Sequence, residues 1–188
     1  MPYEEPYLGQ GCTTPYSGGA VALRISWSVV QSTLFRWSPR PLHAFRARLL
    51  KLFGADIPEV DQVVIFPTAS VVFPRNLSLS PRSVIGPKVV LYNLARISLL
   101  RGATISQNGY LCAGTHDYNR WSMPLVAKPI VVGENAWLGA SVFVGPGVSV
   151  GNLCVVGACS VVVKDLPAAT VCGGNPCRVI KKRKTPVD

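Results

Sequence analysis

The chain of 188 residues is short of acidic side chains and of histidine. It has 9 Asp and Glu against 19 Lys and Arg, a formal charge of +10, and two histidines. No acidic residue lies between Pro6 and Ala55. Such a basic surface suits an anionic partner (nucleic acid, anionic lipid or a phosphorylated ligand) or serves solubility alone. Few aromatic residues stand among the cations near the C-terminus, so the stacking surface of a nucleic-acid binder is missing, and no nucleic-acid partner is expected.

Long apolar runs and disulfide patterns are missing too. No stretch approaches the roughly 18 apolar residues that a membrane span requires. The opening residues 1–5 are acidic and begin no secretory signal, so the cytoplasm is the expected location, with the inner membrane surface left open. The six cysteines contain no Cys-x-x-Cys pair and are expected to be reduced core or corner residues. A zinc site of three histidines cannot be built from two, so no metal is predicted.

What the chain does have is a six-residue repeat over residues 132–167. The first position of each hexad is aliphatic, and the second is Gly in five of six hexads: the first positions are Val132, Leu138, Val144, Val150, Val156 and Val162. The fifth positions are small or aliphatic, and strand alternation turns them inward as well. This period is typical of a β-solenoid in which three hexads close one triangular coil. Gly at the second position is expected to supply backbone angles that a side chain forbids.

The repeat divides the chain into an N-terminal extension (1–60), a solenoid (61–170) and a basic C-terminal segment (171–188). Less regular hexads are predicted to open at Phe73, Leu79, Ile85 and Leu91, and then, after a slip of two residues, at Leu99, Ile105 and Leu111. From Leu111 to Val132 the chain takes 21 residues, where three hexads would take 18. Three extra residues should therefore bulge out in a loop over 115–130. A loop that interrupts a regular scaffold is the expected place for a functional site.

Two helices are predicted in the N-terminal extension. Residues 20–35 alternate like a strand but also fit a helical stripe, and we favour the helix. A basic amphipathic helix is expected over 39–53, capped by Ser38 and ended by Gly54, with Leu42, Phe45, Leu49 and Leu52 along one face. Such a helix can cover the open end of a solenoid or lie on a membrane surface, and peripheral membrane contact remains an open alternative.

The two histidines have different surroundings. His116 ends the last hexad before the predicted loop, where a rigid coil can hold a side chain that still reaches a crevice. Histidine can take up and release protons near neutral pH, so His116 is a candidate general base. His43 lies among arginines in the amphipathic helix and is expected to be a surface residue.

Several stretches closely resemble the hexapeptide-repeat acyltransferases. They are 111–118 (Leu-Cys-Ala-Gly-Thr-His-Asp-Tyr), 128–139, 144–147, 163–165 and 174–180. Within that family the chain looks most like the colanic-acid-type sugar O-acetyltransferases. The resemblance implies a mainly β protein, a left-handed parallel β-helix with an N-terminal helical segment. It also implies a homotrimer that binds acetyl-CoA between adjacent subunits.

The activity implied is transfer of the acetyl group of acetyl-CoA to a hydroxyl of a sugar. The acceptor would be a polysaccharide precursor or a nucleotide-linked or lipid-linked saccharide, with His116 as the general base. A non-sugar acceptor, such as an amino acid or an antibiotic, is the alternative.

The resemblance also implies roles for other positions of this chain. Those that match the cofactor site are Trp137, Ala140, Ala158, Val163, Lys164, Arg178 and Lys181. Cations suit the pyrophosphate and ribose phosphate of CoA. Ala140 and Val163 stand where related enzymes have hydroxyl side chains. Asn93 matches a residue that contacts the acceptor. Asp117 and Tyr118 either orient the base and touch the acceptor or only shape the loop.

Overall fold

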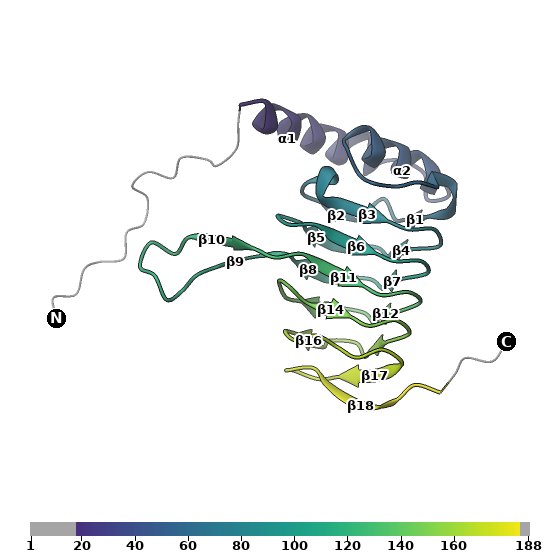
Figure 1. Ribbon diagram of the computed structural model, residues 1–188. Coiled ribbons are helices and arrows are strands. Elements are labelled where there is room, and N and C mark those ends of the chain that lie inside the picture. The colour runs from purple at the N-terminus through teal and green to yellow at the C-terminus, as the bar shows by residue number, and fades with distance from the viewer. Residues whose placement is uncertain (1–17, 185–188) are drawn as a thin grey trace.

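The computed structural model describes residues 18–184, which form a triangular prism of stacked coils beneath two helices (Figure 1). The start of the predicted N-terminal extension and the last four residues of the predicted basic segment lie outside this range. The helices are α1 (Gly18–Val30), continued by a π-helix over Gln31–Phe35, and α2 (His43–Leu52). Short 3-10 turns cover Val60–Gln62 and Pro74–Asn76. The predicted helix over 20–35 is therefore confirmed.

Three sheets form the faces of the prism, and the chain visits them in the order seven-stranded, five-stranded, four-stranded. The seven-stranded face contains β1 (Val64–Ile65), β4 (Val84–Ile85), β7 (Thr104–Ile105), β12 (Trp137–Leu138), β15 (Val155–Val156), β17 (Thr170–Gly173) and β18 (Arg178–Lys182). The five-stranded face contains β2 (Ser70–Val71), β5 (Val90–Tyr92), β8 (Tyr110–Cys112), β13 (Phe143–Val144) and β16 (Val161–Val162). The four-stranded face contains β3 (Leu77–Leu79), β6 (Ile97–Leu99), β11 (Ile130–Val132) and β14 (Ser149–Val150). All neighbouring strands of these faces are parallel except β17 and β18, so the mainly β solenoid is confirmed.

The predicted hexads account for the core. Side chains at equivalent positions of successive coils lie in register and are buried; on the seven-stranded face they are Ile65, Ile85, Ile105, Leu138, Val156 and Cys172. The fifth positions, from Ala136 to Leu166, are buried as well. Cys154, at a fifth position, lies in this apolar column, where burial raises the pKa of its thiol to about 12. It is a core residue that forms no disulfide among the described residues.

The reason for Gly at the second position differs from the prediction. The left-handed backbone angles occur two residues later, at Asn135 (φ 51°) and Ser141 (φ 58°) among others. Three of the five second-position glycines are needed for close approach: a Cβ would lie 2.6 Å from the Asn152 nitrogen at Gly133, 2.8 Å from the Ala158 nitrogen at Gly139 and 2.5 Å from the Ala168 nitrogen at Gly151. At Gly145 and Gly157 the nearest atom would be 3.5 Å away, an ordinary contact. Gly therefore lets adjacent coils touch at the corners.

The register of the first coils also needs one correction. Val71, not Phe73, occupies the inward position of the first coil, because it pairs with Leu91 of the next. The two-residue slip occurs in both early coils at the same corner. In the first coil it is taken up by the 3-10 turn over Pro74–Asn76.

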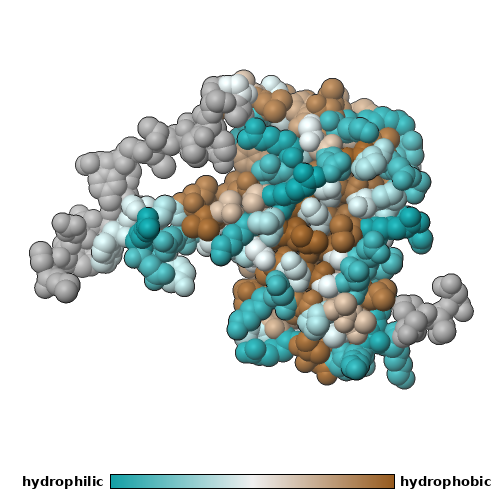
Figure 2. Space-filling view, in the orientation of Figure 1, coloured by the Kyte–Doolittle hydropathy of each residue, from teal (hydrophilic) through white to brown (hydrophobic). Residues whose placement is uncertain are grey.

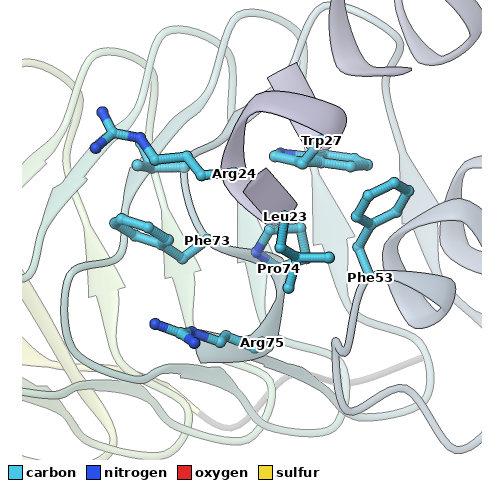
Figure 3. A pocket seen from close by; sticks show the side chains of 8 residues that line it. Leu23, Arg24, Trp27, Phe53, Phe73, Pro74 and Arg75 are labelled. Carbon is cyan, nitrogen blue, oxygen red and sulfur yellow. The ribbon is translucent and has the colours of Figure 1, made fainter. Parts of the chain in front are cut away.

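Helix α1 covers the end of the first coil and satisfies the free edge of β2. The Trp27 indole Nε1 donates to the Val71 carbonyl at 2.6 Å, and the Val71 N–H donates to the Gln31 side-chain oxygen at 2.7 Å. The Trp27 ring packs against Phe53, with centroids 5.2 Å apart, in the apolar contact shown in Figure 3.

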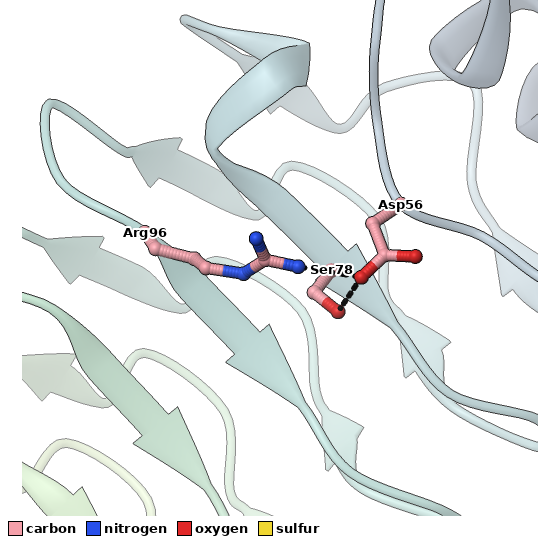
Figure 4. A network of polar contacts seen from close by, with 3 residues as sticks. All are labelled: Asp56, Ser78 and Arg96. Atoms are coloured by element: carbon pink, nitrogen blue, oxygen red, sulfur yellow. Dashed lines mark hydrogen bonds and ion pairs between the residues drawn. The ribbon is translucent and has the colours of Figure 1, made fainter.

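The other two edges of the first coil are closed by different groups. Arg46 of α2 donates from Nε to the Ile65 carbonyl of β1 at 2.6 Å. Asp56 forms a parallel bridge with β3, and its carboxylate binds Ser78 and Arg96 (Figure 4). An uncapped solenoid end would leave these backbone groups without partners. The helical segment therefore acts as a cap.

Helix α2 starts later than predicted because Arg46 organises the residues before it. Its guanidinium donates to the Ser38 hydroxyl and to the carbonyls of Pro39 and Arg40, so residues 38–42 wrap around a cation. Ser38 does not cap α2, and its hydroxyl donates to the Phe35 carbonyl at the end of the preceding helix. Burial without a carboxylate partner lowers the pKa of Arg46. The predicted end at Gly54 (φ +94°) is confirmed.

The buried side of α2 also differs from the predicted stripe. Arg46, Ala47 and Leu50 are buried, whereas Leu52 is 78% exposed. His43, expected on the surface, is half-buried, with Nδ1 2.9 Å from the Ile65 carbonyl oxygen.

Candidate active site

The predicted loop is a β-hairpin that projects from the prism (Figure 1). Strands β9 (Gly114–His116) and β10 (Leu125–Ala127) pair antiparallel, with His116 opposite Leu125. The hairpin leaves at the corner between the five-stranded and four-stranded faces. The step from Leu111 to Val132 is 21 residues, against eight from Leu91 to Leu99, so the insertion is a whole hairpin and not three extra residues.

The base of the hairpin is fixed to the coils. Lys128 N–H donates to the Ala113 carbonyl at 2.9 Å. Gly114 lies against Leu94 of the preceding coil, where an added Cβ would be 2.5 Å from Leu94 Cδ1. The hydrogen bond and this close packing together hold the base of the hairpin against the coils.

His116 is exposed near the tip of the hairpin, and its ring is held by one hydrogen bond. Nδ1 lies 2.6 Å from the carbonyl oxygen of Met123, in the turn that returns to β10. A carbonyl can only accept a hydrogen bond, so in the neutral ring Nδ1 carries the proton and Nε2 keeps its lone pair. The hydrogen bond therefore selects the tautomer that can accept a proton at the outward nitrogen. No sequence pattern indicates Met123, because its backbone and not its side chain makes the contact.

Asp117 organises the tip beyond His116. Its carboxylate accepts the Asn119 N–H at 3.1 Å and lies 3.5 Å from Arg120 Nε, while its own N–H donates to the Pro124 carbonyl at 3.0 Å. These contacts support the loop-shaping interpretation of Asp117. Tyr118 is 82% exposed and available to a ligand.

Asn93 differs from its predicted place at the acceptor. It is fully buried at the corner between the first two coils. Its side-chain oxygen accepts the N–H groups of Val72 and Phe73, and its amide nitrogen donates to the Phe73 carbonyl at 2.6 Å. Its polar atoms therefore close this corner, and direct contact with an acceptor is not available to it.

Three of the predicted cofactor residues lie on the seven-stranded face and the corner after it. Trp137 projects from β12, with its indole Nε1 donating to the Ser106 hydroxyl at 2.8 Å. Ala140 and Ala158 follow β12 and β15 on successive coils, and the Cys159 N–H donates to the Ala140 carbonyl at 2.8 Å. Ala158 is exposed, so its backbone and methyl group are accessible to a ligand.

The other four predicted cofactor residues lie toward the C-terminal end of the prism. Val163 and Lys164 follow β16 at the corner from which the hairpin emerges two coils earlier. Arg178 and Lys181 belong to β18, which pairs with β17. All three cations are exposed, and none takes part in the ion pairs found among residues 18–184. They are available to a phosphorylated ligand.

Within one chain the predicted residues therefore fall into separate groups. His116, Val163 and Lys164 belong to one corner of the prism, and Trp137, Ala140 and Ala158 belong to the seven-stranded face and a second corner. The structure of a single chain does not bring the two groups together.

A row of aromatic side chains near the hairpin was not found from the sequence. Tyr92, Tyr110 and Phe143 point outward from the five-stranded face, and the Tyr110 and Phe143 rings stack with centroids 5.9 Å apart. Burial, and then the nearby Cys112 and Tyr92, raise the pKa of Tyr110. Strand alternation could have predicted their outward direction, because each of these three residues directly precedes or follows an inward aliphatic position.

Residues 18–184 contain neither a metal site nor a membrane span. No group of three His, Cys, Asp or Glu side chains could hold a metal ion within that range. None of the helices there has the length and apolar character needed to cross a membrane.

Comparisons with known proteins agree with this architecture. Residues 129–164 match the family described as bacterial transferase hexapeptide (six repeats). The chain is 45% identical over 166 residues, 88% of this chain and 90% of the relative, to the "putative colanic acid biosynthesis acetyltransferase WcaF" of Escherichia coli K12.

Solved structures share the fold. The hexapeptide-repeat acetyltransferase VCA0836 of Vibrio cholerae, complexed with acetyl coenzyme A, is 27% identical, with a TM-score of 0.77 over 89% of this chain and 91% of that one. A maltose O-acetyltransferase of Clostridium difficile 630 is 25% identical, with a TM-score of 0.77 over 89% of this chain and 90% of that one.

Proposed function

The chain belongs to the hexapeptide-repeat acetyltransferases and is an acetyl-CoA-dependent O-acetyltransferase, and from this premise we propose that it acetylates a sugar hydroxyl with His116 as the general base. The observation that carries the proposal is the hydrogen bond from His116 Nδ1 to the Met123 carbonyl. It leaves Nε2 as a proton acceptor on a hairpin that projects from a rigid scaffold.

Acetyl-CoA supplies an activated acetyl thioester. His116 Nε2 takes the proton of the acceptor hydroxyl as that oxygen bonds to the acetyl carbon, and the sulfur of CoA leaves and receives a proton in turn. The Met123 carbonyl keeps the ring in one orientation and favours the positive charge that the imidazole gains. A positioned base contributes roughly 10² to 10⁴ to the rate, and holding both substrates in place contributes the rest.

The exposed cations fit the phosphorylated part of the co-substrate. Lys164, Arg178 and Lys181 have no carboxylate partner among the described residues and would bind the phosphates of CoA. Trp137 and the backbone at Ala140, Ala158 and Val163 would line the rest of the ligand. The charges of these side chains therefore match the negative charges of the CoA phosphates.

Assembly as a homotrimer is part of the proposal. His116 and Trp137 stand on different sides of one prism. Three prisms packed side by side would set the hairpin corner of one subunit against the seven-stranded face of the next. Each active site would then be completed by two subunits, which explains why a single chain carries two half-sites.

The acceptor is proposed to be a polysaccharide precursor, either a nucleotide-linked or a lipid-linked saccharide. The Escherichia coli relative is named for colanic acid biosynthesis and the Clostridium difficile neighbour is a maltose O-acetyltransferase, and both names support a sugar. Asp117 and Tyr118 lie beside the base, and the exposed Tyr118 ring offers a surface on which a sugar can stack. An amino acid or antibiotic hydroxyl is the second candidate.

The test is acetyl-CoA turnover, followed as free thiol, over nucleotide sugars, free saccharides and non-sugar hydroxyl compounds. The informative variant is His116→Asn, since an amide can still donate to the Met123 carbonyl but cannot act as the base. Turnover should fall by about 10² to 10⁴ while acetyl-CoA binding is retained. Unchanged turnover in His116→Asn would refute the role of the base, and turnover only with non-sugar hydroxyls would refute the acceptor class.

A further inference from the structure

The outer surface of the helical cap exposes several large apolar side chains to water. Trp37 is 83% exposed, and Ile25, Val29, Leu34 and Leu52 are each more than half exposed. The inner side of the same helices is fully occupied by the first coil, through Trp27, Phe35 and Leu50 among others. Large apolar side chains that are exposed together on one part of a surface mark an interaction site.

Part of this surface is shaped as an open groove. Leu34, Trp37, Pro39, Leu42 and Phe45 line a cavity of about 450 Å³ between the end of the π-helix and the start of α2. Residues 38–42 wrap around Arg46 between the two helices. Leu42 and Leu52 of the predicted apolar stripe are exposed, whereas Leu49 packs against the core.

The cap helices themselves carry charge of one sign, and the nearest carboxylate, Asp61, lies in the 3-10 turn beside α2. Residues 18–52 contain no Asp or Glu and six cations. Arg46 is buried and Arg48 pairs with Asp61, but Arg36 and Lys51 are exposed and enter none of the ion pairs of the described chain. Figure 2 shows hydrophobic and hydrophilic side chains interspersed over this end of the molecule.

We propose that this cap surface docks onto an anionic lipid surface, and that the protein works at the inner face of a membrane. Arg36 and Lys51 would face lipid phosphates while Trp37 and Leu34 enter the interfacial layer, where tryptophan is favoured. A second copy of the chain is disfavoured as the occupant, since two cap surfaces would bring cations against cations.

The position of the cap is consistent with this use. The cap lies at one end of the prism, and the hairpin projects from its side (Figure 1). A flat lipid surface can therefore contact the cap without covering His116, whatever the acceptor is. The proposal thus stands or falls separately from the identity of the acceptor.

The test is flotation of the full chain with vesicles of equal parts phosphatidylglycerol and phosphatidylcholine, compared with phosphatidylcholine alone. Binding is expected only to the anionic vesicles, and it should weaken as salt is raised. Arg36→Glu and Trp37→Ser should each lower the bound fraction about tenfold or more. Arg101→Glu makes the same charge change on an exposed arginine of the coils and should leave binding unchanged.

Acetyl-CoA turnover with a soluble acceptor should be the same in Trp37→Ser and the unchanged protein, which shows that the variant is folded. Absence of binding to the anionic vesicles at low salt would overturn the proposal, as would equal losses in Arg36→Glu and Arg101→Glu. A Trp37→Ser variant that changes the oligomeric state instead of vesicle binding would show that a second copy covers the cap.

Discussion

In the coils, inward side chains such as Leu99 and Leu138 are completely buried between neighbours above and below, whereas in the β9–β10 hairpin His116, Tyr118 and Leu125 are exposed. The coils gain their stability from repetition, because each inward residue packs against its equivalents in the next coils. The residues of the hairpin have no equivalents in neighbouring coils to pack against, and the hairpin is held mainly by backbone contacts. Stability thus comes from the inward residues of the coils and the proposed base lies on the hairpin, so substitutions at these two kinds of position should affect one property without the other.

The largest change in the free energy of unfolding is expected for an inward residue of the coils. Leu99→Ala removes a buried side chain from β6, between Leu79 and Val132, and should lower the free energy of unfolding by about 2–5 kcal/mol. Ser98→Ala on the same strand points outward and should change it by less than about 0.5 kcal/mol. Chemical denaturation measures both. Equal effects would mean that the inward column is not the source of stability.

A second substitution tests the joint between the two regions. Gly114→Val places atoms against Leu94 Cδ1, so it should displace the hairpin and lower turnover by about tenfold to a hundredfold. Adding Leu94→Ala to Gly114→Val opens the space and should restore part of the rate. Steady-state kinetics compare the two variants, and no recovery in the double variant would contradict the steric account.

A substitution of Asn93 tests whether this buried polar residue stabilises the coils or contacts the acceptor. Asn93→Ala leaves the Phe73 N–H without its partner, while the Val72 N–H keeps the Leu91 carbonyl, and should cost about 1–3 kcal/mol of stability. KM for the acceptor should not change. Thermal unfolding and kinetics are measured on the same sample, with the exposed Gln107→Ala as the control. A raised acceptor KM at unchanged stability would return Asn93 to the active site.

The smallest effect is expected on β18. Lys181→Ala should raise KM for acetyl-CoA about two- to fivefold at low salt, since an exposed cation contributes little in water. Lys182→Ala, the next residue and on the opposite side of the strand, should not change KM. The difference between the two variants should shrink as salt is added. Identical KM values for the two variants would remove Lys181 from the cofactor strip.

The sequence predicted the coils well because their determinant is a short period. Val132 and its equivalents are buried at the expected spacing, so strand alternation alone located the core. The role of the glycines could not be obtained this way, since the contact of Gly133 with Asn152 depends on how adjacent coils stack. Such a distance is a property of the assembled prism.

The candidate site was predictable only in part. His116 was selected by its place at the end of the repeat and by the family resemblance, but its hydrogen bond to the Met123 backbone depends on the turn of the hairpin. Asn93 was misplaced because polar residue types in a repeat protein can serve corners as well as ligands. Arg46 was missed because a cation at a core position contradicts the usual pattern, and only its five contacts with nearby carbonyls and side chains make burial tolerable.

The seal on the first coil has a consequence for aggregation. Parallel strands stacked in register resemble the core of a fibril, and an open end could recruit further chains without limit. Trp27, Arg46 and Asp56 occupy the three free edges at one end, and the antiparallel β18, with Arg178, Lys181 and Lys182, charges the other. The groups at the two ends therefore oppose the addition of further chains to the stack of strands.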